Sequence, residues 1–433
     1  MPPTGAVGED YVQNALLLRK TSIRIHFLTH YFHPEGNAPA SRVLALGKRW
    51  VKAGHRVTVI TCAPNVPNGV VYPGYKNRWC QRETVEGIEV VRVWTYIAAN
   101  KGTVRRILNY LSYMVTASWR SLWLPRPDLV VATSPQFFCG WAGILAARLR
   151  RVPLVLEIRD IWPESIAAIE AIGNRHVLRF IEYLERKMYE AASRIVTVGD
   201  GYRWRLIEKG VPDSKMDVVM NGLDTDIFSP HPPDAEFVRR WNLEGKFVCS
   251  YIGTIGLACG LDAVLKAAAC LKERGQNDVV FMLVGDGAKR LALEDEARQQ
   301  GLDNVRFTGR QDKQTIPEWL AVSGACLVHL KKTELFKTVM PSKIFEAAGM
   351  ARPIINGVSG FAAEFVKKAG AGICIEPENV QQLVDAVLYL KNNPREASRI
   401  GEVGRNYVFT HYNRDKLAAD YLRILERAVQ PSG

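Results

Sequence analysis

The chain has 433 residues, of which 47% are hydrophobic and 9% aromatic, and its formal net charge at pH 7 is +13. This composition excludes an intrinsically disordered chain, and the length exceeds one typical hydrophobic core, so we expect two domains. The excess of basic residues suits an anionic partner such as nucleic acid, a phosphorylated substrate or an acidic membrane surface, but it does not choose among them.

In the first half of the chain, runs of β-branched residues alternate with helical patterns. These runs predict strands at residues 23–32, 57–62, 88–95, 129–132, 154–158 and 194–198. The helical patterns predict helices at residues 43–53, 140–150, 177–192 and 202–209. Strands separated by helices of this length predict a parallel sheet that is covered on both faces.

The same pattern starts again in the second half. It predicts strands at 247–252, 279–284, 305–308, 325–330, 353–356 and 372–375, with helices at 261–274, 289–300, 316–321 and 380–392. We therefore expect an α/β fold of two Rossmann-like, doubly wound parallel-sheet domains that face a cleft. The expected divisions are an extension at 1–22, an N-terminal domain at 23–220, a turn- and proline-rich linker at 221–240, a C-terminal domain at 241–410, and a last helix at 411–433 that packs back toward the first domain.

Two stretches raise the question of a membrane. Residues 129–147 carry no charge and are almost long enough to span a bilayer, but the Ser134-Pro135 break predicts a strand, a loop and a helix instead. Residues 103–126 combine four arginines with an apolar face, in a pattern typical of an interfacial helix or of a helix packed on its own sheet (Arg105, Arg106, Arg120 and Arg126 with Tyr110, Trp119 and Trp123).

The cysteines and the N-terminus bear on the compartment. Eight cysteines are scattered without a C-x-x-C pair or a His/Cys cluster, so no zinc site is predicted. The first twenty residues lack the basic-then-apolar order of a signal peptide, and we expect a cytoplasmic protein.

The stretch 340–355 predicts a short loop, a helix of about two turns and a buried strand. Pro341 and Ser342 suit the start of the helix, whose unpaired N–H groups and dipole can hold a phosphate. Lys343 adds a positive charge there, and Glu346 lies one turn further on, where it can accept hydrogen bonds from the hydroxyls of a sugar. The alternative is an ordinary capped core helix.

Ligands of open parallel sheets bind beyond the carboxyl ends of the strands. Asp160 and Glu164 follow a predicted strand, and Asp160 is a candidate to orient or deprotonate an acceptor hydroxyl, with a buried ion pair to Arg159 as the alternative. Residues at the start of the first helix are candidates to face the acceptor or its phosphate (Gly36, Asn37 and Arg42). The alternative for Arg42 is a surface charge of that helix.

Eight segments, taken together in their order and spacing, resemble one family: HPEGNAPASR, GHRVTVIT, LEIRDIWPES, VVMNGLDTDIFSP, YIGTIGLACGLD, LVGDG, VRFTG and PSKIFEAAGMARPII. From about residue 23 to 428 the chain resembles the retaining glycosyltransferases of family 4, which have the GT-B fold. Within that family it is most similar to the fucosaminyltransferase-like enzymes of O-antigen, capsule and exopolysaccharide assembly.

The resemblance implies a nucleotide-sugar donor, with UDP preferred, held mainly by the C-terminal domain. Glu346 matches the second glutamate of the family motif and would hold the ribose hydroxyls, whereas the first glutamate is replaced by Thr338. Ser342 and Lys343 match the positions that seat the diphosphate. The family's glycine loop falls on Gly253 and Gly256. The basic pair that usually follows it is replaced by Thr254 and Cys259. The candidates to neutralise the leaving diphosphate are therefore Lys343, Arg310 and Lys332, with Lys343 preferred.

The resemblance also implies a polyprenyl-diphosphate-linked saccharide as acceptor and a place on the cytoplasmic face of the inner membrane, reached through residues 103–126. A histidine that many relatives carry after the fourth strand is absent from ATSPQ, so catalysis is not assigned by that rule. We expect no cofactor and no essential metal, because the Asp-x-Asp spelling of Asp224 and Asp226 lies in the linker.

Two alternatives remain open from the sequence. A UDP-sugar 2-epimerase would share the two-domain architecture but would act on the donor without an acceptor. A basic nucleic-acid-binding protein would explain the charge, but no helix-turn-helix or RNA-recognition motif supports it, and we expect no nucleic-acid partner.

Overall fold

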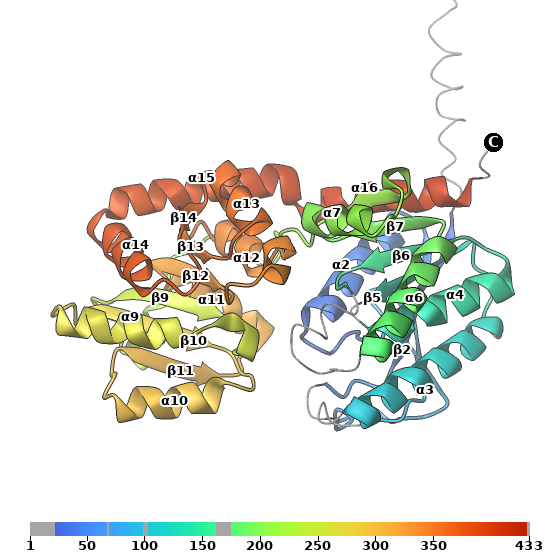
Figure 1. Ribbon diagram of the computed structural model, residues 1–433, viewed down its shortest axis with the longest axis horizontal. Helices are drawn as coiled ribbons and strands as arrows, with labels where there is room; N and C mark the ends of the chain where they lie inside the picture. The colour runs from blue at the N-terminus through green and yellow to red at the C-terminus, as the bar shows by residue number, and fades with distance from the viewer. Residues whose placement is uncertain (1–21, 67–68, 98–102, 135, 162–174, 431–433) are drawn as a thin grey trace, which may run out of the picture.

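The computed structural model describes residues 22–66, 69–97, 103–134, 136–161 and 175–430. Its two α/β domains lie side by side (Figure 1). The described N-terminal sheet has the strand order β3-β4-β2-β1-β5-β6-β7-β8, and every neighbouring pair is parallel except β3–β4. Its strands are β1 (Arg24–Leu28), β2 (Arg56–Cys62), β3 (Cys80–Val85), β4 (Ile88–Val93), β5 (Leu129–Ser134), β6 (Leu154–Ile158), β7 (Arg194–Thr197) and β8 (Met216–Val218).

Helices cover both faces of this sheet. The apolar core of one face is shared with α3 (Thr103–Leu122), α4 (Phe137–Arg150), α6 (Arg175–Ala191) and α7 (Asp200–Glu208). The core of the other face is shared with α2 (Ala38–Lys52) and with α16 (Arg414–Val429), the last helix of the chain. Trp50 of α2 donates its indole N–H to the carbonyl of Ala418 at 2.9 Å, and the ring of Tyr421 packs edge-on against it. The C-terminal helix is therefore part of the N-terminal core (Figure 1).

The C-terminal sheet is parallel throughout, with the order β11-β10-β9-β12-β13-β14. Its strands are β9 (Phe247–Ile252), β10 (Val279–Val284), β11 (Val305–Gly309), β12 (Ala325–His329), β13 (Ile354–Gly357) and β14 (Gly372–Cys374). Its helices are α8 (Ala235–Arg240), α9 (Asp262–Glu273), α10 (Arg290–Gln299), α11 (Ile316–Ala321), α12 (Lys343–Gly349), α13 (Phe361–Ala369), α14 (Val380–Asn392) and α15 (Pro394–Tyr412), with single turns η2 (Leu257–Cys259), η3 (Lys313–Thr315) and η4 (Leu335–Thr338). A further single turn, η1 (Asp213–Lys215), precedes β8 in the N-terminal domain.

The pattern of apolar residues predicts most of these elements, but not all. It misses β3, whose side chains alternate between half-buried and exposed as on an edge strand, and it misses β8, which has three residues. It also places the start of α2 too late, at residue 43. The helix begins at Ala38 because the side chain of Asn37 accepts the N–H of Ala40 at 2.9 Å and Pro39 suits the first turn.

Only part of the expected linker at 221–240 connects the domains. Its last six residues form α8, and the rings of Phe237 and Trp241 pack on the buried Trp319 of the C-terminal domain. α8 therefore belongs to the second domain.

Residues 129–147 form β5 and α4, as the Ser-Pro break predicts. Among the residues that the structure describes, no helix combines the length and the apolar character needed to cross a membrane.

The helix predicted within residues 103–126 is present as α3. Tyr113 and Ala117 are buried against the sheet, so the helix packs on its own domain. Its opposite side nevertheless exposes Val104 and Trp119, and Trp123 is exposed in the turn that follows the helix. The protein thus presents large apolar side chains to solvent on this helix.

Arg42 does not lie at an open surface, in contrast to both roles considered for it. Its side chain is buried and donates to the carboxylate of Glu157 at 2.9 Å and to the carbonyl oxygens of Val219 and Met220 at 2.8 and 2.7 Å. Burial alone would raise the pKa of Glu157, but Arg42 and Arg159 beside it hold that pKa below its usual value. The pair therefore ties β6 to α2 and to the chain that leaves the domain.

We expect Arg42→Met to lower the free energy of unfolding of the N-terminal domain by about 3–5 kcal/mol, because it leaves Glu157 buried and without its charged partner. Urea unfolding followed by circular dichroism measures the change. Arg82→Met is the control: Arg82 faces Glu89 at 3.9 Å on the exposed surface, and its loss should cost about 0–1 kcal/mol. Equal effects of the two variants would contradict the role assigned to Arg42.

Candidate active site

Two glycine-containing loops pack backbone against backbone at the carboxyl edge of the second sheet. Gly253 follows β9 and donates its N–H to the carbonyl of Val284 at 2.9 Å, and Ile255 donates to the carbonyl of Asp286 at 3.0 Å. A Cβ on Gly285 would overlap the carbonyl oxygen of Gly253, so no other residue fits there without moving the loop. This contact fixes the height of the Gly253 loop above the sheet.

Lys343, the first residue of α12, reaches this loop from the neighbouring strand. Its Nζ atom lies 3.6 Å from the centre of the Tyr251 ring and 3.0 Å from the position that a Cβ on Gly253 would take. Among the described residues its ammonium has no hydrogen bond or ion pair. Burial lowers the pKa of Lys343 to about 8, while the carboxylate of Glu346 acts in the opposite direction. The structure thus brings together Gly253 and Lys343, and leaves the cation available to an anion.

Glu346 lies one turn along α12 and is half-buried. Burial raises its pKa, and three cations oppose that shift, namely Arg414, Lys313 and Lys343. No side-chain hydrogen bond to Glu346 is formed within the part of the chain that the structure describes. Its oxygens are therefore open to external donors such as hydroxyl groups.

Ser342 stands directly before α12 and makes no side-chain cap bond. The helix has seven residues, about two turns as predicted, and the groups available at its start are the first backbone N–H groups and the charge of Lys343. Thr338, where the family motif has its first glutamate, is in η4 and donates its hydroxyl to the carbonyl of Leu335 at 2.8 Å.

Two other expected donor residues lie apart from this group. Gly256 precedes η2 at the end of the glycine loop. Arg310 follows β11, is exposed, and acts electrostatically on Asp286 at the outer end of the stacked loops. Lys332, the third candidate cation, is paired with Glu376 at 3.3 Å.

His329 is a residue of this site that the sequence reasoning missed. It is buried at the end of β12, where Nδ1 donates to the carbonyl of Cys259 at 2.7 Å and Nε2 accepts the N–H of Glu378 at 2.9 Å. Burial lowers its pKa, which keeps the ring neutral as these two bonds require. The signal in the sequence that could have identified His329 is its place at the end of an apolar strand. His329 ties the glycine loop to the loop after β14.

The carboxyl edges of both sheets meet at an interdomain junction, which we define by the contacts of Ser41, Gly201, Lys313 and Thr338. Lys313 of η3 donates to the hydroxyl of Ser41 in α2 at 3.1 Å. A Cβ on Gly201 of α7 would overlap the backbone of Thr338. Burial lowers the pKa of Lys313, which also lies near Glu346. Lys313 was not predicted, because nothing in its neighbouring residues indicates a contact with the other domain.

Asp160 lies on the N-terminal side of this junction, after β6. It is half-buried, and burial raises its pKa to about 6 while Arg159 opposes the shift. The two side chains form no ion pair within 4.0 Å in the described structure, so the alternative of a buried Arg159–Asp160 pair is not observed. Asp160 also acts on Tyr202 of α7, the helix that contacts Thr338. Glu164 falls outside the described residues.

The start of α2 contributes less than we expected. Gly36 is exposed, with no atom within 4 Å of the place of a Cβ. Asn37 uses its side-chain oxygen as the helix cap, so this oxygen is not free for an acceptor. Of the three residues expected here, only Gly36 stays open to a ligand.

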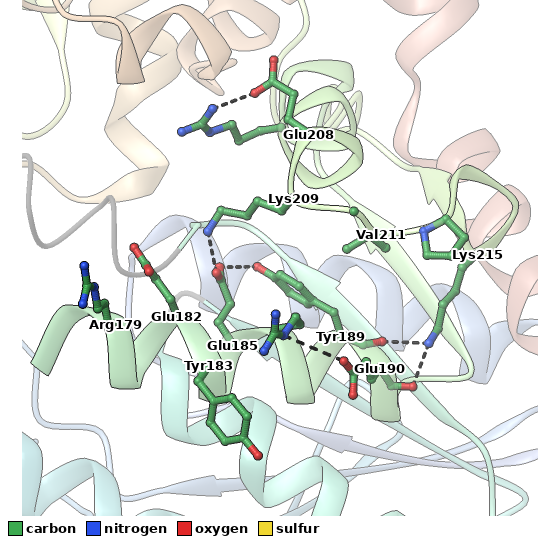
Figure 2. Close-up of a pocket in the computed structure, with 14 residues that line it drawn as sticks. Arg179, Glu182, Tyr183, Glu185, Tyr189, Glu190, Glu208, Lys209, Val211 and Lys215 are labelled. Carbon is green, nitrogen blue, oxygen red and sulfur yellow. Dashed lines mark hydrogen bonds and ion pairs between the residues drawn. The ribbon is translucent and has the colours of Figure 1, made fainter. Parts of the chain in front are cut away.

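A cavity of about 780 Å³ lies elsewhere, between α6 and α7 (Figure 2). Its floor holds the buried carboxylate of Glu185, which accepts from the hydroxyl of Tyr189 at 2.6 Å and from Lys209 at 2.5 Å. None of the predicted site residues lines it. We assign the Glu185 network to the packing of the two helices.

No group of three or more His, Cys, Asp or Glu side chains that would suit a metal ion is formed by the described residues. Asp224 is buried and bonds to Arg414 at 2.8 Å, and Asp226 faces Lys48 at 3.8 Å. The Asp-x-Asp pair thus has structural partners.

Comparison with known proteins identifies both halves of the chain. Residues 37–222 match the model of a glycosyl transferase 4-like domain, and residues 234–407 match that of glycosyl transferases group 1. The putative colanic acid biosynthesis glycosyl transferase WcaI of Escherichia coli K12 is 27% identical over 361 residues, which cover 79% of this chain and 87% of WcaI.

Solved structures agree on the fold. Alr3699/HepE of Anabaena, in complex with UDP-glucose, has a TM-score of 0.71 at 17% identity and covers 94% of this chain and 100% of its own. WaaG, a glycosyltransferase involved in lipopolysaccharide biosynthesis, has a TM-score of 0.67 at 17% identity over 92% of this chain and 99% of its own. The predicted GT-B fold is confirmed, and the epimerase alternative is not favoured.

The chain therefore belongs to the glycosyltransferases, with a glycosyl transferase 4-like domain followed by a glycosyl transferases group 1 domain.

Proposed function

We propose that this glycosyltransferase is a retaining enzyme that moves a sugar from a UDP-linked donor to a polyprenyl-diphosphate-linked saccharide in the synthesis of a bacterial surface polysaccharide. The observation that carries the proposal is the convergence of Lys343, Gly253 and Glu346 at one sheet edge, where the cation and the carboxylate have no hydrogen-bond or ion-pair partner among the described residues. WcaI, a putative colanic acid biosynthesis enzyme, supports a polysaccharide product, and HepE, solved with UDP-glucose, supports a UDP-sugar donor. The narrower fucosaminyltransferase type has no such support, and the transferred sugar stays open.

In this proposal the donor diphosphate lies against Lys343 and the backbone of the Gly253 loop, and the ribose hydroxyls donate to Glu346. As the bond between the sugar and the diphosphate breaks, negative charge grows on the leaving oxygen, and Lys343 stabilises it. The acceptor hydroxyl attacks from the same face, so the configuration at the sugar is retained. Asp160 orients that hydroxyl and takes its proton, for which a pKa of about 6 suits it. Glu164 remains a second candidate.

The remaining contacts are those of the loops and the acceptor. Ser342 adds a backbone N–H to the diphosphate, Gly256 lets the loop approach it, and Arg310 adds positive charge at the outer end of the site. Gly36 faces the acceptor. Because Lys343 supplies the charge that a divalent cation would supply, we propose that neither a metal nor another cofactor is needed.

Donor hydrolysis in the absence of acceptor tests the assignment. We expect the protein to release nucleotide faster from UDP-sugars than from GDP- or dTDP-sugars, and to do so in the presence of EDTA. Release of epimerised UDP-sugar instead would revive the 2-epimerase, and tight, salt-dependent oligonucleotide binding would revive the nucleic-acid alternative.

We expect Glu346→Ala to weaken UDP binding by about 1.5–3 kcal/mol, the usual range for hydrogen bonds to a charged group. Calorimetric titration of UDP and of 2′-deoxy-UDP into both proteins measures the contact itself. The wild-type protein should prefer UDP, and the variant should bind the two nucleotides equally. The exposed Glu364→Ala serves as control and should behave as wild type. A preference for UDP that survives in Glu346→Ala would reject the ribose contact.

The lowered pKa of Lys343 gives UDP binding a pH dependence. The lysine is cationic below its pKa of about 8 and neutral above it, so affinity should fall by about tenfold per pH unit as the pH rises above 8. Lys343→Ala should bind weakly at every pH and lose this slope, whereas Lys332→Ala should keep both affinity and slope. A slope that is the same in Lys343→Ala would assign the titration to another group.

We further propose that α3 holds the protein on the cytoplasmic face of the inner membrane. The helix and the turn that follows it carry arginines and two exposed tryptophans, Trp119 and Trp123, but no acidic residue. Flotation with anionic liposomes at low salt should succeed for the wild type and fail after replacement of Arg105, Arg106 and Trp119 by alanine. A triple variant of equal charge change on other surfaces, at Arg395, Arg399 and Trp204, should still float. Unchanged flotation of the α3 variant would remove this proposal.

A further inference from the structure

A groove of about 510 Å³ lies on the outer side of the N-terminal domain, between α3 and the start of β3. Its walls are Trp79 and Cys80 from the β3 side, Val115 and Trp119 from one side of α3, and Trp123 from the turn after that helix. Its volume falls within the range of about 300–1,000 Å³ that is usual for small-molecule sites. Trp79 lies outside the stretch 103–126, so the sequence pattern did not include it.

The tryptophans form walls around the groove. Trp79 is 74% exposed, Trp119 63% and Trp123 66%. The ring of Trp79 rests against that of Trp94, with 5.3 Å between their centres, and Trp119 lies 6.1 Å from Trp123. Contiguous apolar surface of this kind on a soluble domain usually marks a binding site.

The groove lies at the carboxyl edge of the sheet. Cys80 pairs with Val93, the last residue of β4, and Thr116 donates its hydroxyl to the carbonyl of Trp94 at 2.9 Å. Asp160 follows β6 at the same edge. In the sheet order β6 is four strand spacings from β4, which corresponds to roughly 20 Å. A long ligand can therefore lie along this edge with one end in the groove and the other at Asp160.

The charges select the ligand. Arg120 lines the groove, and its buried Nε–H has no hydrogen-bond partner in the described structure. Arg105 and Arg106 lie on the same helix, which has no acidic residue. An apolar groove with a cation in its wall is complementary to a hydrocarbon chain that carries a phosphate. A peptide fits less well, because the walls offer few partners for its backbone N–H and C=O groups.

We propose that this groove binds the isoprenoid chain of the lipid-linked acceptor, with Arg120 on its diphosphate. The inference rests on the proposed function and adds a lipid subsite to it. The hydrocarbon chain packs between the tryptophan rings, and the saccharide extends along the sheet edge toward Asp160.

Calorimetric titration of the full chain with farnesyl diphosphate tests the subsite. We expect Trp79→Ala/Trp119→Ala to weaken binding by about tenfold or more, because each tryptophan contributes a large apolar contact area. Val115→Glu, on an exposed position of the helix, should have a similar effect and guards against a folding defect in the double variant. Trp204→Ala, which removes an exposed tryptophan of α7, should bind like the wild type.

Two further measurements show which part of the ligand the groove binds, and whether the groove binds a single lipid-linked molecule or a bilayer. Inorganic pyrophosphate should bind the wild type and the tryptophan variants equally, because it lacks the chain. The tryptophan variants are also tested on vesicles of equimolar phosphatidylglycerol and phosphatidylcholine. If these variants lose vesicle binding but bind farnesyl diphosphate like the wild type, the tryptophans only enter a bilayer, and the proposal is overturned. Equal farnesyl diphosphate affinity in all proteins would also overturn it.

Failure of the subsite and failure of the transferase assignment are distinguishable. Hydrolysis of UDP-glucose without acceptor reports on the donor site alone and should be the same in the wild type and the groove variants. Retained hydrolysis with no effect of the groove variants on farnesyl diphosphate would reject the groove and keep the transferase.

Discussion

The relative position of the two domains depends on two connecting segments that are hydrogen-bonded to each other. The chain leaves the N-terminal domain near Leu223 and returns to it near Asn413, and these segments form a parallel bridge. Leu223 donates its N–H to the carbonyl of Tyr412 at 2.7 Å and accepts that of Arg414 at 3.0 Å, while Arg414 bonds to Asp224 at 2.8 Å. Because both crossings are tied at one place, any movement of the domains must turn about this place. Arg414 also acts on Glu346, so the bridge and the proposed ribose contact share a charge.

Burial at the junction disfavours charge on several of the groups that the proposed reaction uses. It lowers the pKa of Lys343 and raises those of Glu346 and Asp160. Holding ionisable groups in this state costs stability, and such groups are common where ligands bind. A bound diphosphate would restore the charge of Lys343, and ribose hydroxyls would solvate Glu346. The free energy of donor binding thus includes relief of unfavourable burial as well as new contacts.

The sequence predicts the sheets well because buried parallel strands are short continuous apolar runs, and β9 and β10 begin and end as predicted. It also groups Gly253 with Lys343, since both follow neighbouring strands of one sheet. It fails where the partner is distant along the chain. Arg42 is misassigned because its partner Glu157 is more than a hundred residues away. Lys313 is missed for a similar reason, since its contact is with the other domain.

In the proposed function the two ligands need different surfaces, and these surfaces lie on different domains. A nucleotide needs backbone N–H groups, a cation and a carboxylate within a few ångströms, and the stacked glycine loops beside α12 provide them in the second domain. A lipid-linked saccharide is long and amphiphilic, so it needs an extended edge with an apolar end. The first sheet provides such an edge because β3 and β4 extend it beyond β2, away from Asp160, and place Trp79 next to α3. In the proposed function the antiparallel β3 therefore has a second consequence: it extends the edge assigned to the acceptor toward α3 and the exposed tryptophans.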